Sequence, residues 1–155
     1  MAPLAKVITV SDGVAAGVRE DRSGDALAAH LAEQGFDVVE RVVTGDGVDA
    51  VADTLRAACQ DFAGLVVTTG GTEFGPRDLT PEGTRAVLER EAPGLAEAMR
   101  LVSPLGRLSR AVAGSRGESL VLNTPGSTKG CVETLEAVLD VIPHALELLG
   151  GGRPH

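Results

Sequence analysis

Residues 64–84 read GLVVTTGGTEFGPRDLTPEGT, and this stretch decides the fold. An apolar run ends at Thr69, two glycines follow, and a helical pattern begins only after Asp78. A short apolar run bounded by turn residues predicts a buried strand that leads through a loop into a helix. The same order of strand, loop and helix recurs toward both ends of the chain.

Further strands and helices are predicted from the same kinds of pattern. The apolar runs at 6–10 and 36–44 predict two strands, and 118–127 predicts another strand followed by a turn. Apolar residues at helical spacing predict helices over 24–34 and 48–59. Because strands alternate with helices, the expected fold class is α/β, with a mostly parallel sheet covered by helices on both faces.

The pattern is less regular after Asp78. Thr80 is expected to be the N-cap of the next helix, with Pro81 at its first position. The Pro-Gly pair at 93–94 is expected to break that helix, and another helix starts over 95–102. Residues 106–117 are interpreted as a loop with at most a short irregular piece.

The end of the chain predicts a final helix. Apolar residues from Cys131 to Ile142 recur at helical spacing, and Pro143 is expected to kink or restart this helix. The glycine-rich tail, residues 150–155, is expected to be frayed.

The composition favours a compact protein that binds neither nucleic acid nor membrane. The 155 residues, 43% of them hydrophobic, fit a single domain over 1–155 with a core at about 6–149. A net charge of −8 and the lack of Trp and Tyr argue against a nucleic-acid surface. No apolar run is long enough to span a bilayer and the N-terminus does not resemble a secretory signal, so we expect a cytoplasmic protein.

Cysteines and histidines do not indicate a disulfide framework or a zinc site. The two cysteines, Cys59 and Cys131, have no metal-binding spacing. The histidines are scattered at positions 30, 144 and 155.

Polar turns follow three of the predicted strands: SDG, TTGGT and NTPGS. We expect them to lie together, because ligands of parallel sheets bind at the carboxyl ends of the strands. Gly70 and Gly71 can adopt conformations in which successive N–H groups converge on an anion, and the hydroxyls of Thr69 and Thr72 would add donors. The pattern is typical of a phosphate site, although the glycines could also simply turn the chain.

Two aspartates also follow strand ends and are candidate magnesium ligands. Asp78 lies in the loop after the third strand, and Asp46 lies in the turn after the second. A hydrated Mg²⁺ on phosphates needs only one or two carboxylates. The alternative is that Asp78 is a turn residue and that the Gly-Asp-Gly around Asp46 is an ordinary tight turn.

These residues belong to a set of segments that resembles a known family. The segments are TTGGTEFGPRDLTPE with SDG, EDRSG, LSRAVAG, LNTPGSTKG and IPHALELL, in this order along the chain. They resemble the MogA/MoaB family of molybdenum-cofactor biosynthesis proteins and the homologous domain of gephyrin. The resemblance runs from about residue 7 to residue 149.

The resemblance implies a three-layer α/β fold and an enzyme that transfers AMP from Mg²⁺-ATP to molybdopterin. It implies catalytic roles for Asp46 and Asp78, which would also be the residues that hold Mg²⁺. Binding of the nucleotide and the pterin phosphate is implied for Ser11, Asp12, Gly70, Gly71, Thr72, Pro125, Gly126 and Ser127. Family members form trimers or hexamers, so a homo-oligomer is expected, with contacts to other molybdenum-cofactor enzymes as a further expectation.

Cations are needed beside two anionic substrates, and Arg77 and Lys129 are the candidates. Alternatively, Arg77 pairs with a nearby carboxylate and Lys129 points into water. Ser127 could cap the last helix as well as bind phosphate.

Three positions depart from the family pattern. Glu73 stands where a glycine is usual, Ala15 where many members have Ser, and Thr124 where Leu is usual. A carboxylate at position 73 could repel a phosphate, so a catalytically weak or inactive molybdopterin-binding protein is the alternative to the enzyme. A scaffold function, as in gephyrin, is a third and weaker alternative.

Overall fold

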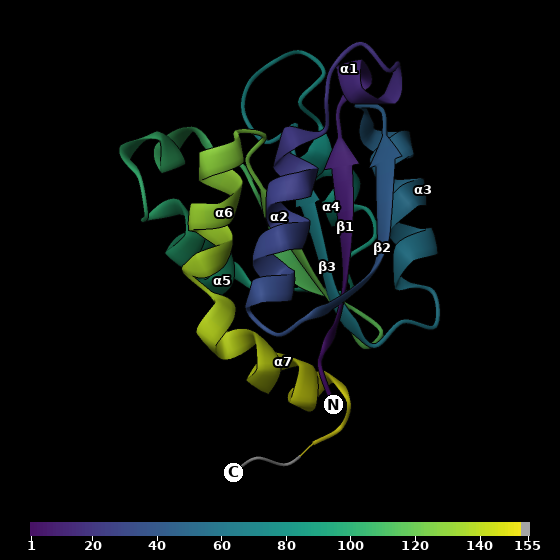
Figure 1. Ribbon diagram of the computed structural model, residues 1–155, viewed down its shortest axis with the longest axis vertical. Helices are drawn as coiled ribbons and strands as arrows, with labels where there is room; N and C mark the ends of the chain where they lie inside the picture. Colours follow the sequence, from purple (N-terminus) through teal and green to yellow (C-terminus); the bar gives the residue numbers. More distant parts are fainter. Residues whose placement is uncertain (153–155) are drawn as a thin grey trace.

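The computed structural model describes residues 1–152 and contains a six-stranded sheet in the order β2-β1-β3-β6-β5-β4 (Figure 1). Strands β2, β1, β3 and β6 run parallel, whereas β5 and β4 pair antiparallel. The strands are β1 (Leu4–Val10), β2 (Asp37–Thr44), β3 (Gly64–Thr69), β4 (Arg90–Glu91), β5 (Ala113–Arg116) and β6 (Ser119–Thr124). The predicted mostly parallel sheet is confirmed.

Helices cover both faces of this sheet and complete a three-layer α/β sandwich. They are α1 (Asp12–Ala15), α2 (Arg22–Glu33), α3 (Val48–Cys59), α4 (Thr80–Arg85), α5 (Pro93–Arg100), α6 (Thr128–Glu136) and α7 (Ile142–Leu149), with 3₁₀ helices η1 (Pro104–Leu108) and η2 (Leu139–Val141). Helices α2, α5, α6 and α7 contribute to one hydrophobic core, and α3 contributes to the core on the opposite face, where α4 packs against it (Figure 1).

Side chains of the central strands alternate between these two cores. Leu65 and Val67 of β3 belong to the core with α2 and α6, whereas Val66 belongs to the core with α3. This follows from the strand geometry, in which successive side chains point to opposite faces. Both faces of β3 and β6 are buried, and strands of this kind give continuous apolar runs that are easily recognised in a sequence.

The order of the strands creates a crevice between β1 and β3. Strand β1 pairs with β2 on one side and with β3 on the other, so the chain reverses its direction across the sheet at this point. After Val10 the chain leads to α2 on one face of the sheet, and after Thr69 it leads to α4 on the opposite face. Ligands of open α/β sheets bind in such a crevice at the carboxyl ends of the strands.

A buried asparagine of β6 joins the sheet to helix α4. The Asn123 Nδ2 group donates to the hydroxyls of Thr68 and Thr84, both at 3.0 Å. Its Oδ1 accepts from the Val112 N–H at 3.1 Å. The Asn123 amide therefore links β6 to β3, to α4 and to the segment before β5, with partners for both its oxygen and its nitrogen.

Three details of the sequence prediction are wrong. Thr80 is the first residue of α4 rather than its N-cap, and its hydroxyl donates to the Gly70 carbonyl at 2.9 Å. Helix α4 ends at Arg85, so Pro93 does not break it but lies at the start of α5. Residues 106–117 are not all loop, because they contain β5, which pairs with β6.

The predicted final helix is divided into α6 and α7, with η2 between them. Pro143 lies in the first turn of α7, where its missing N–H is tolerated, so the predicted restart of the helix is confirmed. The expected frayed tail covers residues 150–155, of which 153–155 lie outside the described residues. The N–H of Gly152 donates to the Glu147 carbonyl at 2.8 Å.

Candidate functional site

A cavity of about 260 Å³ lies at the carboxyl ends of β1 and β3, and we call it the switch-point cavity. Its walls include Ser11, Arg19, Asp46, Gly71, Asp78 and Gly126. The loops after β1, β2 and β3 and the turn after β6 all contribute. The structure therefore brings together the two aspartates and the glycine turn that were singled out in the sequence, while their roles remain predictions.

Two further cavities continue from the first along the same edge of the sheet. The middle cavity, of about 550 Å³, shares Gly71, Asp78 and Gly126 with the switch-point cavity. The third cavity, of about 260 Å³, shares Glu73 and Ser127 with the middle one. We call it the apolar cavity. The three cavities adjoin one another through these shared residues, and together we call them the groove.

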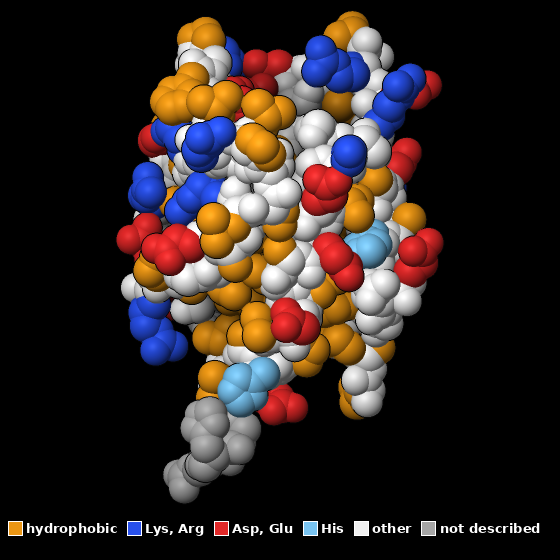
Figure 2. Space-filling view, turned by 90° about the vertical axis from the view of Figure 1, so that its left-hand side faces the viewer, with side chains coloured by type: hydrophobic (Ala, Val, Ile, Leu, Met, Phe, Trp, Pro, Cys, Tyr) orange, Lys and Arg blue, Asp and Glu red, His pale blue; other side chains and the backbone are white. Residues whose placement is uncertain are grey.

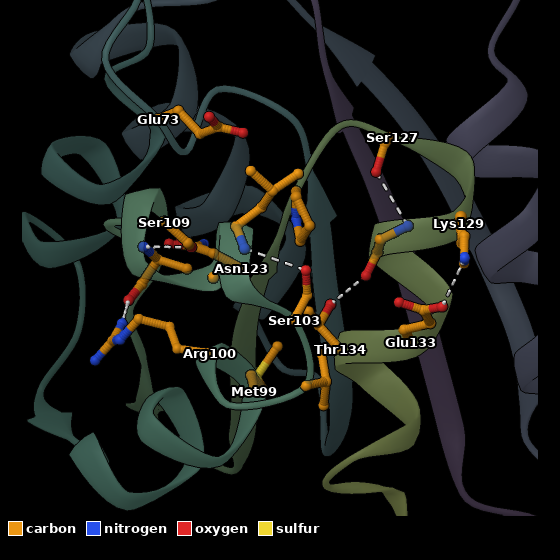
Figure 3. Close-up of a pocket in the computed structure, with 16 residues that line it drawn as sticks. Glu73, Met99, Arg100, Ser103, Ser109, Asn123, Ser127, Lys129, Glu133 and Thr134 are labelled. Atoms are coloured by element: carbon orange, nitrogen blue, oxygen red, sulfur yellow. Dashed lines mark hydrogen bonds and ion pairs between the residues drawn. The ribbon is translucent and has the colours of Figure 1, made fainter.

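The apolar cavity lies between η1, the end of β6 and α6 (Figure 3). Met99, Val102 and Leu105 supply apolar walls, whereas Asn123 and Thr134 supply polar atoms. Mostly apolar pockets with a few fixed polar groups suit flat heterocycles that have a polar edge. This cavity can therefore hold a ring, whereas Asp46 and Asp78 line the switch-point cavity.

Asp12 and Asp46 are joined by reciprocal hydrogen bonds. The Asp12 N–H donates to Asp46 Oδ2 at 2.9 Å, and the Asp46 N–H donates to Asp12 Oδ1 at 3.0 Å. Arg77 Nε donates to Asp12 Oδ2 at 2.8 Å, and its Nη2 donates to the Asp46 carbonyl at 2.9 Å. Of the two alternatives for Arg77, the structure shows the one in which it pairs with a carboxylate. Arg77 and Asp12 hold the loops after β1, β2 and β3 together.

The two carboxylates of this network differ in their electrostatics. Hydrogen bonds from Arg77 lower the pKa of Asp12. Burial raises the pKa of Asp46, and this effect, together with the nearby charges of Asp12 and Asp78, outweighs the hydrogen bond from the Asp12 N–H, which lowers it. Asp46 is thus a carboxylate whose negative charge is poorly compensated by the protein, and a cation beside it would stabilise the ionised form.

Mg²⁺ fits this donor set. Asp46 and Asp78 line the same cavity and offer only oxygen atoms, which are the ligands that Mg²⁺ prefers. Among residues 1–152, no group of three or more His, Cys, Asp or Glu could hold a metal ion. A magnesium ion that keeps several waters and shares phosphate oxygens needs no larger set.

The glycine turn has a special backbone, but some of its donors are already used. Gly70 and Gly71 have φ of +104° and +69°, values that favour glycine. The Gly70 N–H donates to the Thr124 carbonyl at 3.1 Å, and the Thr69 hydroxyl donates to the Pro125 carbonyl at 2.8 Å. These two donors connect β3 to the turn after β6, which differs from the expectation that they face a phosphate.

The turn after β6 lies where the cavities meet. Gly126 lines the switch-point and middle cavities, and Ser127 lines the middle and apolar cavities. Ser127 Oγ also accepts from the Gly130 N–H at 3.0 Å, so this residue caps α6. Lys129 lines the apolar cavity and its Nζ lies 3.7 Å from Glu133 Oε1 (Figure 3).

Two arginines at the site were not predicted from the sequence. Arg19 lines the switch-point cavity and forms no ion pair with any residue in the described part of the chain. Because Arg77 is paired with Asp12, Arg19 is a cation of this cavity that is still available to an anion. Arg110 pairs with Glu82 and contacts the loop that carries Asp78. The position of Arg19 in the cavity and the contacts of Arg110 both depend on loop conformation, and the spacing of residues in the sequence does not indicate them.

Known proteins are similar to this chain in sequence and fold. The family described as "Probable molybdopterin binding domain" matches residues 6–144. The chain belongs to this family. The molybdopterin adenylyltransferase of Helicobacter pylori strain J99 is 40% identical over 152 residues, which cover 94% of this chain and 86% of the relative.

Solved structures of the molybdopterin-binding family agree with this assignment. The molybdopterin biosynthesis enzyme MoaB of Thermus thermophilus is 45% identical, with a TM-score of 0.90 and coverage of 96% of this chain and 97% of that one. The molybdopterin biosynthesis Mog protein of Mycobacterium ulcerans is 39% identical, with a TM-score of 0.89 and coverage of 96% and 99%. The resemblance that the motifs indicated is confirmed. No helix within residues 1–152 has the length and hydrophobicity needed to cross a bilayer.

Proposed function

We propose that this protein transfers AMP from Mg²⁺-ATP to molybdopterin in molybdenum-cofactor biosynthesis. The observation that carries the proposal is the arrangement of Asp46, Asp78 and the glycine turn around one cavity that continues into an apolar cavity. Such a groove can place a phosphate beside a cation while holding a ring nearby. Relatives that match most of the chain and are named molybdopterin adenylyltransferases support the proposal.

The chemistry requires alignment and charge neutralisation more than covalent help from the protein. A terminal phosphate oxygen of molybdopterin attacks the α-phosphorus of ATP, a new P–O bond forms, and pyrophosphate leaves with the electron pair of the broken α–β bond. Mg²⁺, held by Asp46 and Asp78, would neutralise charge on the phosphates. Arg19 would hold a phosphate oxygen at the switch-point cavity, and the apolar cavity would orient the pterin.

The decisive experiment is an incubation of the protein with molybdopterin and Mg²⁺-ATP. We expect adenylylated molybdopterin and an equal amount of pyrophosphate, measured by chromatography with mass detection. A tight molybdopterin complex without transfer would contradict the proposal and support a binding protein of the same pathway.

Glu73 is the observation that favours this second function. It lines both the middle and the apolar cavities, and its carboxylate pairs with no cation among residues 1–152. A negative charge at this position opposes binding of a phosphate. If the wild type binds molybdopterin without transferring AMP, Glu73→Gly tests whether the carboxylate is the cause. Removal of the carboxylate should then allow transfer.

Arg19→Gln is expected to raise the Kd for Mg²⁺-ATP about 10-fold, equivalent to roughly 1.4 kcal/mol. The reason is the loss of a charged donor from the switch-point cavity, where Arg77 is already paired. Calorimetry at constant ionic strength measures the change, because salt screens exposed charges. The control is Arg22→Gln, since Arg22 is exposed and pairs with Glu20. Equal affinities for wild type and Arg19→Gln would rule out this contact.

We also propose a cytoplasmic homo-oligomer, a trimer or a hexamer. Exposed apolar side chains on and around η1 support an interface there, because contiguous apolar patches mark contact surfaces. They are Phe74, Leu101, Val102, Leu105 and Leu108. Figure 2, which faces the side that carries α6, shows hydrophobic side chains at several places on this face, including a group at its upper left. Sedimentation equilibrium measures the mass of the assembly directly.

A further inference from the structure

Arg110 contacts the loop between β3 and α4 at both of its ends. Its N–H donates to the Thr72 carbonyl at 2.8 Å, and its Nε donates to the Glu73 carbonyl at 2.7 Å. Its Nη2 donates to the Asp78 carbonyl at 2.6 Å. The remaining nitrogen, Nη1, donates to the Glu82 carboxylate of α4 at 2.5 Å. A single side chain and its own amide therefore bind the first residues of the loop, the last residues and the following helix.

Besides Arg110, the loop is attached to its surroundings through Arg77, which binds Asp12 Oδ2 at 2.8 Å and the Asp46 carbonyl at 2.9 Å on the side of β1 and β2. No helix or strand lies between Thr69 and Thr80. Within the loop, the Gly75 N–H donates to Asp78 Oδ2 at 3.0 Å and the Asp78 N–H donates to the Gly75 carbonyl at 2.9 Å. These bonds shape the tip of the loop but do not attach it to the sheet. The backbone bond from Thr80 to Gly71, at 3.1 Å, closes only its base.

This loop carries side chains that line the cavities. Asp78 lines the switch-point and middle cavities, and Glu73 lines the middle and apolar ones. Phe74 also lines the middle cavity, and its ring centroid lies 5.6 Å from the Arg110 guanidinium carbon. Any movement of the loop would therefore move a predicted magnesium ligand and an aromatic wall of the middle cavity together.

We propose that Arg110 is a positioning residue that fixes the Asp78 carboxylate and the Phe74 ring at the groove, an inference that rests on the proposed function. Arg110 does not line the switch-point, middle or apolar cavity, so it acts through the loop rather than on a substrate. Its planar guanidinium supplies donors in fixed directions to two carbonyls and a carboxylate at once. Hydrogen bonds from Arg110 lower the pKa of Glu82, so this partner stays ionised and anchors the guanidinium to α4.

Arg110→Lys tests the role of the guanidinium fork while keeping the charge. We expect kcat for AMP transfer to fall roughly 100-fold, because small displacements of groups that align the substrates lower reaction rates by about this factor. The Mg²⁺ concentration for half-maximal activity should rise, whereas KM for molybdopterin should change little. Arg107→Lys is the matched control, because Arg107 is exposed and its Nε donates only to the Pro104 carbonyl of its own turn. A variant with lower thermal stability but unchanged kcat and Mg²⁺ dependence would overturn the proposal.

A second measurement does not depend on activity. The chain has no tryptophan, so Phe74→Trp introduces a single fluorescent reporter into the loop. In the Phe74→Trp background, Arg110→Lys should lower the indole anisotropy and increase its quenching by acrylamide, and Arg107→Lys should change neither. Identical anisotropy and quenching with and without Arg110 would overturn the proposal. If the wild type bound molybdopterin without transferring AMP, the proposed function would fail, and this reporter would still decide whether Arg110 fixes the loop.

Discussion

Asp78→Asn is expected to lower the rate of AMP transfer at least about 1,000-fold, equivalent to roughly 4 kcal/mol of transition-state stabilisation. The substitution removes a negative charge from the switch-point cavity, where the developing charge on the phosphates must be neutralised by a cation. Asparagine keeps the oxygen that accepts from the Gly75 N–H, so the loop should keep its shape. Asp46→Asn should have an effect of similar size, because Asp46 lines the same cavity.

Single-turnover formation of adenylylated molybdopterin measures these effects, and molybdopterin binding should stay within about threefold of wild type. Asp140→Asn is a suitable control, since Asp140 is an exposed residue of η2 outside the three cavities. If Asp78→Asn or Asp46→Asn retained wild-type turnover, the residue concerned would have no part in transfer.

Gly70→Ala is expected to lower the free energy of unfolding by about 3 kcal/mol or more. Gly70 has a φ of +104°, which residues with a side chain rarely adopt. A Cβ at this position would also overlap the carbonyl oxygen of Val10. That oxygen belongs to the backbone of β1 at the centre of the sheet, so it cannot move aside without disturbing the strand pairing.

Gly35→Ala separates the two causes of this loss. Gly35 has a φ of +90°, but a Cβ there would meet no atom within 4 Å. Gly35→Ala should therefore lower the free energy of unfolding by only about 1 kcal/mol, because only the backbone conformation is unfavourable for alanine. Urea unfolding of both variants gives the comparison. Equal losses would mean that the close approach of Gly70 to β1 has no energetic importance.

The parallel part of the fold could be predicted because its strands are buried on both faces. Strands β3 and β6 both contain a short continuous apolar run, LVV in β3 and LVL in β6, which predicts a buried strand. Strand β5 could not be recognised in the same way, since its sequence, AGSR, has small and polar residues. It exists because β6 offers hydrogen bonds along its free edge, and that partner is known only from the three-dimensional structure. Thr80 resembled an N-cap because threonine is common there, but Leu79 is the N-cap, and the Thr80 hydroxyl donates to a carbonyl of the glycine turn.

The meeting of Asp46, Asp78 and Gly71 could be predicted from topology, since the ends of parallel strands share an edge. The partners of individual side chains could not. Arg77 contacts Asp12, and Arg110 contacts Asp78, across long stretches of intervening chain. Such contacts depend on the paths of two loops at once, and residue type and spacing do not determine those paths.

The hydrogen bonds of Asn123 limit where the protein can change shape. A shift of β6 by one residue against β3 would turn the amide to the opposite face and leave the hydroxyls of Thr68 and Thr84 without it. Competing registers of the sheet are therefore disfavoured, and the floor beneath the groove has a single discrete arrangement. Adjustments during a reaction cycle must come from the loops above this floor, which makes them the place where mutations can alter turnover without altering the architecture.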